Sequence, residues 1–200
     1  WFPIFRNYWT RLKRKEIMVH MSKYIIVGPG ASGKDWMLKK MVELGYSPMR
    51  QYTTREKREN ETGDEYHFVS DDEFKYMDDR AKFISVNFYR IGWYGVSYDE
   101  LVNSDVAILS PANVKDIFNL YPELRDRFTI IYLDIPVSIR RKRLNSRYQS
   151  KIGDDNEVRL ANDERDFKDF TLWDIRFEDV KSIDDFINNF AVVIMKRLHT

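Results

Sequence analysis

Cysteine is absent from the 200-residue chain, and histidine occurs only three times. The sequence therefore excludes disulfide bonds and thiolate metal sites, and His20, His67 and His199 lack the spacing of a metal site. The absence of disulfides is compatible with a reducing compartment, and we expect a cytoplasmic location. No apolar run approaches the ~20 residues of a membrane-spanning helix, so no membrane span is expected.

A large excess of charge of one sign is also missing, because 33 basic residues stand against 32 acidic ones and the formal net charge is +1. Such a balance does not favour general binding of polyanions, so nucleic acid is not an expected partner. The length suits one α/β domain with enough chain to bury a sizeable core. The oligomeric state stays open.

Residues 1–21 differ in composition from the rest of the chain. An aromatic stretch at 1–9 is followed by a basic one at 11–15. We interpret 1–21 as an N-terminal extension, appended or translated from upstream, that is dispensable for turnover. The alternative is an arm that docks on a partner or on a membrane surface, since aromatic and basic side chains suit both.

A glycine-rich loop is the most informative stretch of the sequence. It lies between a short apolar strand expected at 24–27 and a helical pattern with Met37 and Met41 on one face. Glycines let the backbone turn tightly and point several N–H groups at one spot, and the helix N-terminus and Lys34 add positive charge there. This context predicts a P-loop for the phosphates of ATP. The predicted ATP-binding residues are Gly28, Pro29, Gly30, Ala31, Ser32, Gly33, Lys34 and Asp35.

Asp35 departs from the usual motif, which continues with a Ser or Thr whose hydroxyl binds Mg²⁺. A carboxylate also binds Mg²⁺, although it brings negative charge close to the phosphates. Asp35 is therefore a candidate metal ligand, and Mg²⁺ is the expected metal.

The remaining pattern alternates strands with helices, apart from one segment. Alternation of this kind predicts a parallel sheet with helices on both faces. Consecutive strand-like segments within 51–100 interrupt it and predict an inserted β-rich lobe. A polar loop is expected at 151–156. The fold class is thus α/β, a P-loop NTPase fold. The expected strands and helices of the core are 105–110, 112–120, 128–134, 136–146, 157–167, 173–177 and 182–198.

Several separated motifs make about residues 22–190 similar to guanylate kinases. They occur in the family's order: the P-loop, Thr53-Thr-Arg55 with Arg58, Gly63-Asp-Glu-Tyr66-His-Phe, Trp93-Tyr-Gly95, and Arg143-Leu-Asn-Ser-Arg147 followed by Arg159-Leu160. The resemblance implies a nucleoside monophosphate (NMP) kinase that uses ATP, Mg²⁺ and nucleotide substrates. It also implies one domain over 22–200, with a P-loop core at 22–50 and 101–200, an NMP-binding lobe at 51–100 and a lid at about 147–160.

The resemblance assigns roles to charged and aromatic residues. Arg55, Arg58, Tyr66 and Tyr94 would hold the phosphate of the acceptor. Phosphoryl transfer needs positioning and positive charge rather than a covalent nucleophile, and arginine binds phosphate bidentately. The lid is expected to close on ATP. The implied catalytic residues are Lys34, Arg58, Arg147 and Arg159. For Arg140, Arg141 and Lys142, we expect only the solvent-facing side of a helix.

The guanine-reading residues of the family are not matched. The family reads guanine with a Glu, an Asp and two hydroxyls. By register, Ser85 replaces the Glu, the segment 110–112 replaces the Asp at the end of the following core strand, Val96 replaces the hydroxyl after Tyr-Gly, and Gln51 replaces the hydroxyl ahead of Thr-Thr-Arg. Gln51, Ser85 and Asn87 become the expected base contacts. Without the carboxylates, we expect relaxed base selectivity or a preference for another base, such as that of a pyrimidine deoxynucleotide.

Two motifs also resemble phage-type deoxynucleoside monophosphate kinases: Lys34-Asp35 and Tyr132-Leu-Asp-Ile-Pro136. On that resemblance Asp134 is a second candidate for Mg²⁺, and its alternative is a loop residue before the helix at Pro136. Two further functions remain open. One is a strict guanylate kinase with unusual base contacts. The other is a non-catalytic, guanylate-kinase-like protein-binding module, against which Lys34 and the loop glycines argue.

Overall fold

The structure is a computed structural model that describes residues 23–59, 61–63, 65–89, 91–147 and 153–179. For residues 147 and 153–155 it describes the backbone only. The predicted N-terminal extension at 1–21 and the helix expected at 182–198 lie outside the described residues. Within the described ranges, no helix combines the length and the apolar character needed to cross a membrane.

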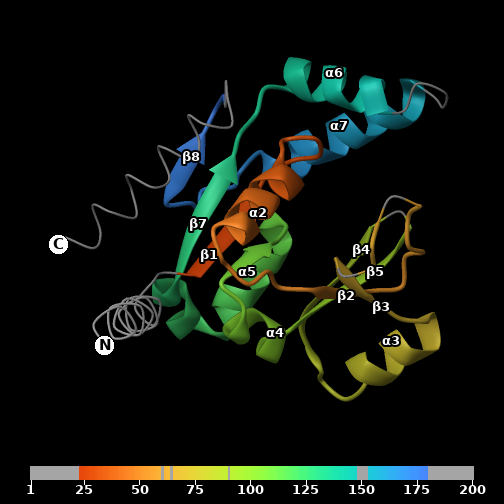
Figure 1. The fold of residues 1–200 in the computed structure, drawn as a ribbon, viewed down its shortest axis with the longest axis vertical. Helices are drawn as coiled ribbons and strands as arrows, with labels where there is room; N and C mark the ends of the chain where they lie inside the picture. Colours follow the sequence, from red (N-terminus) through yellow and green to blue (C-terminus); the bar gives the residue numbers. More distant parts are fainter. Residues whose placement is uncertain (1–22, 60, 64, 90, 148–152, 180–200) are drawn as a thin grey trace, which may run out of the picture.

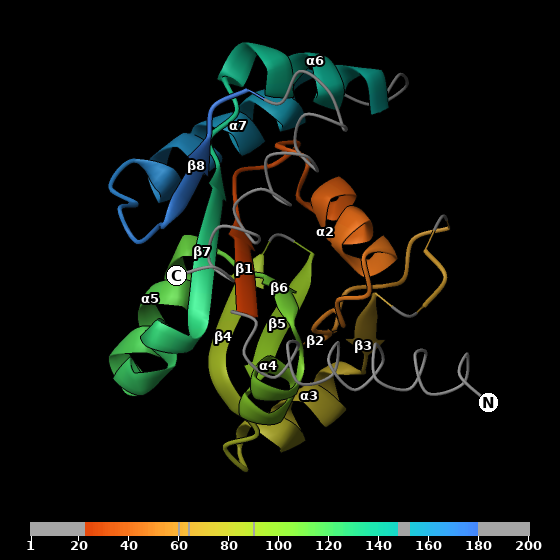
Figure 2. The same ribbon diagram turned by 60° about the vertical axis from the view of Figure 1, so that its left-hand side comes forward.

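The first sheet is parallel and has the strand order β6–β1–β7–β8. Its strands are β1 (Lys23–Val27), β6 (Val106–Ile108), β7 (Phe128–Leu133) and β8 (Ile175–Phe177). Helices lie on both sides of it (Figures 1 and 2). They are α2 (Lys34–Glu43), α4 (Tyr98–Asn103), α5 (Pro111–Leu120), the 3₁₀ helix η1 (Pro122–Arg127), α6 (Val137–Arg147) and α7 (Gly153–Phe167). The predicted α/β class with a parallel sheet is confirmed.

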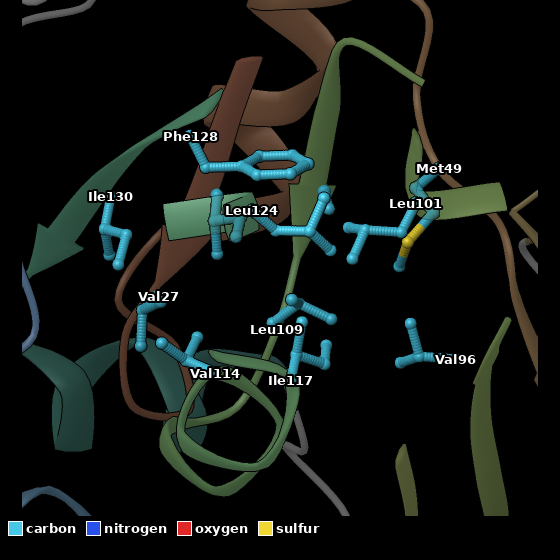
Figure 3. Close-up of a cluster of buried hydrophobic side chains, with 12 residues drawn as sticks. Val27, Met49, Val96, Leu101, Leu109, Val114, Ile117, Leu124, Phe128 and Ile130 are labelled. Atoms are coloured by element: carbon cyan, nitrogen blue, oxygen red, sulfur yellow. The ribbon is translucent and has the colours of Figure 1, made fainter. Parts of the chain in front are cut away.

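Alternation along β1 explains why the helices lie on opposite faces. Ile25 and Val27 join one buried cluster, which includes residues of α5 and η1 (Figure 3). Tyr24 and Ile26 join a second cluster, which includes Met37 and other residues of α2. Successive side chains of a strand point to opposite faces. The central strand is therefore buried on both sides, as its continuous apolar run predicts.

A second sheet lies in the segment where the β-rich insertion is expected. Its strand order is β3–β2–β5–β4, with β5 antiparallel to both neighbours and β2 parallel to β3. The strands are β2 (Gln51–Thr53), β3 (Tyr66–Phe68), β4 (Phe83–Tyr89) and β5 (Gly92–Ser97), and α3 (Asp71–Asp78) connects β3 to β4. This sheet stands beside the lower end of the first one in Figure 1.

Two helical boundaries differ from the prediction. The polar loop expected at 151–156 was wrong for its second half, because α7 already begins at Gly153. Acidic residues in a first helical turn interact favourably with the helix dipole, so polarity alone does not indicate a loop. The short helix α4 was not predicted. Ser97 starts it by accepting a hydrogen bond from the Glu100 N–H with its side chain, as N-cap serines do.

A small apolar cluster attaches α6 and α7 to the glycine-rich loop. Ala31 of the loop is buried against Leu144 of α6 and Leu160 of α7, and Val137 packs beside them. Because apolar burial is the main favourable term in such contacts, these few side chains fix where the two helices lie relative to the loop.

Leu160→Ala is expected to lower the free energy of unfolding by about 2–5 kcal/mol, because it leaves a cavity where α7 meets the loop. Val158→Ala is the matched control on the same helix, since Val158 is 54% exposed. Its effect should stay within about 0.5 kcal/mol. Urea titrations of both variants measure the difference. Equal midpoints would mean that the cluster does not hold α7.

Candidate active site

The loop between β1 and α2 has the backbone of an anion site. Ala31 and Gly33 both have positive φ, at 61° and 109°, which turns successive N–H groups toward one side. Gly33 is the N-cap of α2, and no side chain caps the helix there. The first N–H groups of α2 are therefore left for another acceptor. The Ser32 hydroxyl is also buried without a hydrogen-bond partner among the described residues.

Lys34 lies at the centre of this loop. Its ammonium donates to the carbonyl oxygens of Gly28, at 2.6 Å, and Pro29, at 3.0 Å. Burial lowers the pKa of Lys34 to about 8, although the carboxylates of Asp35 and Asp163 oppose that shift. A bound polyphosphate would reverse the effect of burial, because it places opposite charge beside the ammonium.

Helices α6 and α7 lie beside the loop, on the side away from the second sheet (Figure 1), and each supplies an arginine to it. Arg143 donates to the carbonyls of Ala31, at 3.0 Å, and Ser32, at 3.1 Å. Arg159 lies against Gly30, where a Cβ would come within 2.8 Å of its Nε. The structure thus brings the predicted Arg159 to the loop. Arg147 ends α6, and its side chain is outside the described atoms, so its role stays a prediction.

The interpretation of Arg140 as a solvent-facing residue was wrong. Arg140 is 3% exposed and donates to the carbonyl of Ile135 and the carboxylate of Asp163. Arg140 lies on the side of α6 that faces α7. Helix α6 therefore carries a polar residue on its buried side as well as on its exposed side. Arg141 and Lys142 are exposed, as expected.

The predicted acceptor residues lie on one face of the second sheet. Asn87 pairs with Tyr94 and Ser85 pairs with Val96 across β4 and β5, while Thr53 of β2 pairs with Tyr94. Paired residues point to the same face, and so do residues two apart on a strand. Gln51 of β2 pairs in turn with Tyr66 of β3. The residues that share the face are Gln51, Tyr66, Ser85, Asn87 and Tyr94.

Arg55 forms the cationic centre of this face. Its Nε donates to the Tyr94 hydroxyl at 3.0 Å, and its two terminal nitrogens donate to Glu61 at 2.9 and 2.8 Å. Its guanidinium also lies 5.1 Å from the ring centre of Tyr66. Burial disfavours the charge, but Glu61 and Tyr94 outweigh it and raise the pKa of Arg55. Arg58 is less involved, because its side chain is 55% exposed and 4.0 Å from Glu61.

Tyr66 is the residue of the acceptor face on which the charge of Asp35 acts. Burial, together with the charges of Tyr94 and Asp35, raises its pKa to about 12. Asp35 is an exposed residue in the first turn of α2, directly after Lys34. The charge of Asp35 acts on Tyr66, which indicates that the acceptor face is turned toward the first turn of α2. The two segments are far apart in the sequence, and the fold brings them together.

Helix α5 supplies polar residues that the sequence reading missed. Buried Asn113 donates to the Ser85 hydroxyl at 2.8 Å, and this hydroxyl lies 3.4 Å from the Asp116 carboxylate. Asn87 reaches the same hydroxyl at 3.5 Å, and Gln51 donates to the Ile108 carbonyl at 2.7 Å. The local sequence of α5 shows only an N-cap Ser followed by an Asn and an Asp. Nothing in it indicates that the last two side chains contact Ser85 on the distant strand β4.

The two candidate metal ligands differ in their surroundings. Both oxygens of Asp134 have partners, since Oδ1 accepts from the Tyr132 hydroxyl and Oδ2 from Arg176. Asp35 is exposed beside Lys34. Mg²⁺ is commonly bound by one or two carboxylates together with substrate phosphates, a set that Asp35 fits better than Asp134. Across the described residues, no group of three or more His, Cys, Asp or Glu side chains forms a protein-only metal site.

Comparisons with known proteins agree on one family. A family model described as guanylate kinase matches residues 20–106. A curated guanylate kinase from Wigglesworthia glossinidia brevipalpis is 27% identical over 135 residues, which is 64% of this chain and 65% of that relative, somewhat less than two thirds of its length. The crystal structure of guanylate kinase from Anaplasma phagocytophilum has a TM-score of 0.62 and 17% identity, over 88% of this chain and 86% of that one.

At that identity the crystal structure establishes the fold alone, and the two sequence matches show a similarity to guanylate kinases over part of the chain. These matches support the resemblance found in the sequence: the chain is similar to guanylate kinases in sequence over residues 20–106 and in fold over most of its length.

Proposed function

We propose that the chain is an NMP kinase, which transfers the γ-phosphoryl group of ATP to a (deoxy)nucleoside monophosphate. One observation carries this proposal: the fold holds both an anion-binding loop with Lys34 and a second cationic site built on Arg55, and the charge of Asp35 beside Lys34 acts on Tyr66 of that second site. Two phosphate sites that face each other are what transfer between two nucleotides requires. A binding module would need only one of them.

In the proposed reaction, the loop N–H groups and Lys34 bind the phosphates of ATP. Arg55 and the hydroxyls of Tyr66 and Tyr94 hold the acceptor phosphate so that its oxygen faces the γ-phosphorus in line. Arg159 adds positive charge beside the loop, where charge spreads over the transferring group. Mg²⁺, held by Asp35 and the phosphates, would neutralise charge on the donor. ADP leaves as the oxygen–phosphorus bond to the acceptor forms.

The acceptor base is the finer part of the proposal. Ser85 already bonds to Asn113 and Asp116, and Gln51 to the Ile108 carbonyl, so no carboxylate on β4 is aimed at guanine N1 and N2. We therefore expect relaxed selectivity or a preference for another base. A strict guanylate kinase is the second candidate. The observation that favours it is Asp116, a carboxylate beside Ser85 that comes from α5 instead of β4.

A panel of acceptors tests the base. We expect kcat/KM for GMP and dGMP to lie within about a thousandfold of the best of dAMP, dCMP and dTMP, since exclusive hydrogen-bond partners can discriminate by 10⁴–10⁵. Asp116→Asn is measured alongside. If the guanine nucleotides exceed every other acceptor by more than that factor, and Asp116→Asn removes their advantage, the chain is a strict guanylate kinase that reads guanine from α5.

A further inference from the structure

An acidic side chain of α7 lies inside the arginine cluster at the loop. Asp163 Oδ2 accepts a hydrogen bond of 2.8 Å from the Gly30 backbone N–H and one of 3.2 Å from Arg140. The Asp163 side chain is 19% exposed and that of Arg140 only 4%. Neither the loop motif nor the proposed transfer reaction calls for a carboxylate at this place.

The surroundings of Asp163 are those of an anion site. A Cβ at Gly30 would come within 2.8 Å of both Asp163 Oδ2 and Arg159 Nε, so the carboxylate sits directly on the loop backbone. The negative charge of Asp163 also acts on Lys34 and favours the protonated form of its ammonium. One backbone donor and two cations, Arg140 and Lys34, therefore already act on the Asp163 carboxylate.

We infer that Asp163 is an internal competitor for the donor phosphates. Its carboxylate uses a loop N–H and part of the positive charge that a triphosphate needs, so ATP binds more weakly than the cations alone would allow. Asp163 and Arg159 are four residues apart on α7, hence on one helix face. When ATP displaces the carboxylate from Gly30, Arg159, which already lies against Gly30, meets the phosphates there. The inference rests on the proposed function, because it requires that the loop binds the donor.

Removing the negative charge of Asp163 distinguishes competition with the phosphates from a structural tether, that is, a hydrogen bond that only holds α7 on the loop. Asp163→Asn keeps the size of the side chain and an oxygen that accepts from Gly30, and it removes only the negative charge. A tether would keep much of its hydrogen bonding in this variant, and ATP affinity would stay the same or fall. A competitor would lose its repulsion of the phosphates. We expect the Kd of ATP to fall about tenfold or more, a change that corresponds to ~1.4 kcal/mol.

The experiment is titration calorimetry of the full chain with a non-hydrolysable ATP analogue, which reports binding without turnover. Glu164→Gln is the matched control, since Glu164 is the exposed neighbour of Asp163 and the change in net charge is the same. Its Kd should remain within about twofold of wild type, because exposed charges are well screened. Asp163→Ser, which is smaller and also neutral, repeats the test if the asparagine variant does not fold.

Each result separates the two claims. Tighter binding in Asp163→Asn with an unchanged Glu164→Gln control supports competition. Unchanged or weaker binding in folded Asp163→Asn, with a wild type that binds the analogue, overturns the competition and leaves the kinase proposal intact. If wild type and both Asp163 variants all fail to bind the analogue, the donor site itself is refuted and both proposals fall.

Discussion

Lys34→Ala is expected to lower kcat for phosphate transfer by at least about 100-fold while the fold stays intact. The Lys34 ammonium contacts the loop carbonyls of Gly28 and Pro29, and on binding it would turn to the phosphates. Removing a preorganised charge from a water-excluded site typically costs a factor of this size in the transition state. Stopped assays at saturating ATP and acceptor give kcat directly.

The control for this variant is Lys39→Ala, an exposed lysine on the same helix. It removes the same charge outside the loop, so its kcat should equal that of wild type within about twofold, as surface substitutions allow. Circular dichroism and thermal melting check that both variants fold. Turnover like that of wild type in Lys34→Ala would end the kinase interpretation.

Arg55→Ala should damage use of the monophosphate far more than binding of ATP. Arg55 is 4% exposed, and its fork is oriented by Glu61 and Tyr94 before any substrate arrives. Charge-assisted bonds to a phosphate are among the strongest polar contacts in proteins. We expect kcat/KM for the acceptor to fall by about 100-fold or more, with the Kd of ATP unchanged within about twofold.

Loss of Arg55 also removes two hydrogen bonds from the Glu61 carboxylate. The Glu61 side chain is only 12% exposed, so the stability of the variant must be measured as well. Arg55→Lys keeps a charge but loses the bidentate geometry, and it should fall between wild type and Arg55→Ala. Arg58→Ala is expected to act in the same direction with a smaller effect, because Arg58 is largely exposed. Arg80→Ala, which changes an exposed arginine just after α3, is the control. Equal damage to ATP and acceptor use would contradict the assignment of Arg55.

Local signals account for the parts of the molecule that the sequence predicted well. The apolar runs at 24–27 and 128–134 are buried on both faces, so composition alone identifies them as central strands. The loop from Gly28 to Lys34 is recognisable because its chemistry needs glycines and a lysine at fixed spacing. Arg55, Tyr66 and Tyr94 come from three segments, and only the resemblance to a family suggested that they meet.

The parts that sequence reasoning missed depend on contacts between distant segments. Arg140 lies in α6, a helix that begins directly after Pro136 and is rich in basic residues, and nothing local shows that its own face turns toward α7. Asp163 meets Gly30 across 133 positions of the sequence. The spacing of Arg159 and Asp163 on one helix face was the available signal, but it indicates a shared face and not what that face touches. Asn113 and Asp116 reach Ser85 for the same non-local reason.

The most direct test of the central claim follows the γ-phosphate itself. Wild-type protein is incubated with Mg²⁺, ATP labelled at the γ-position, and each common (deoxy)nucleoside monophosphate in turn. The account predicts that label appears in the β-position of a nucleoside diphosphate in equal amount to the ADP formed, and that Lys34→Ala forms at least about 100-fold less. If wild type binds ATP and yet labels no monophosphate, the chain is a binding module with a guanylate kinase fold, and the kinase account is wrong.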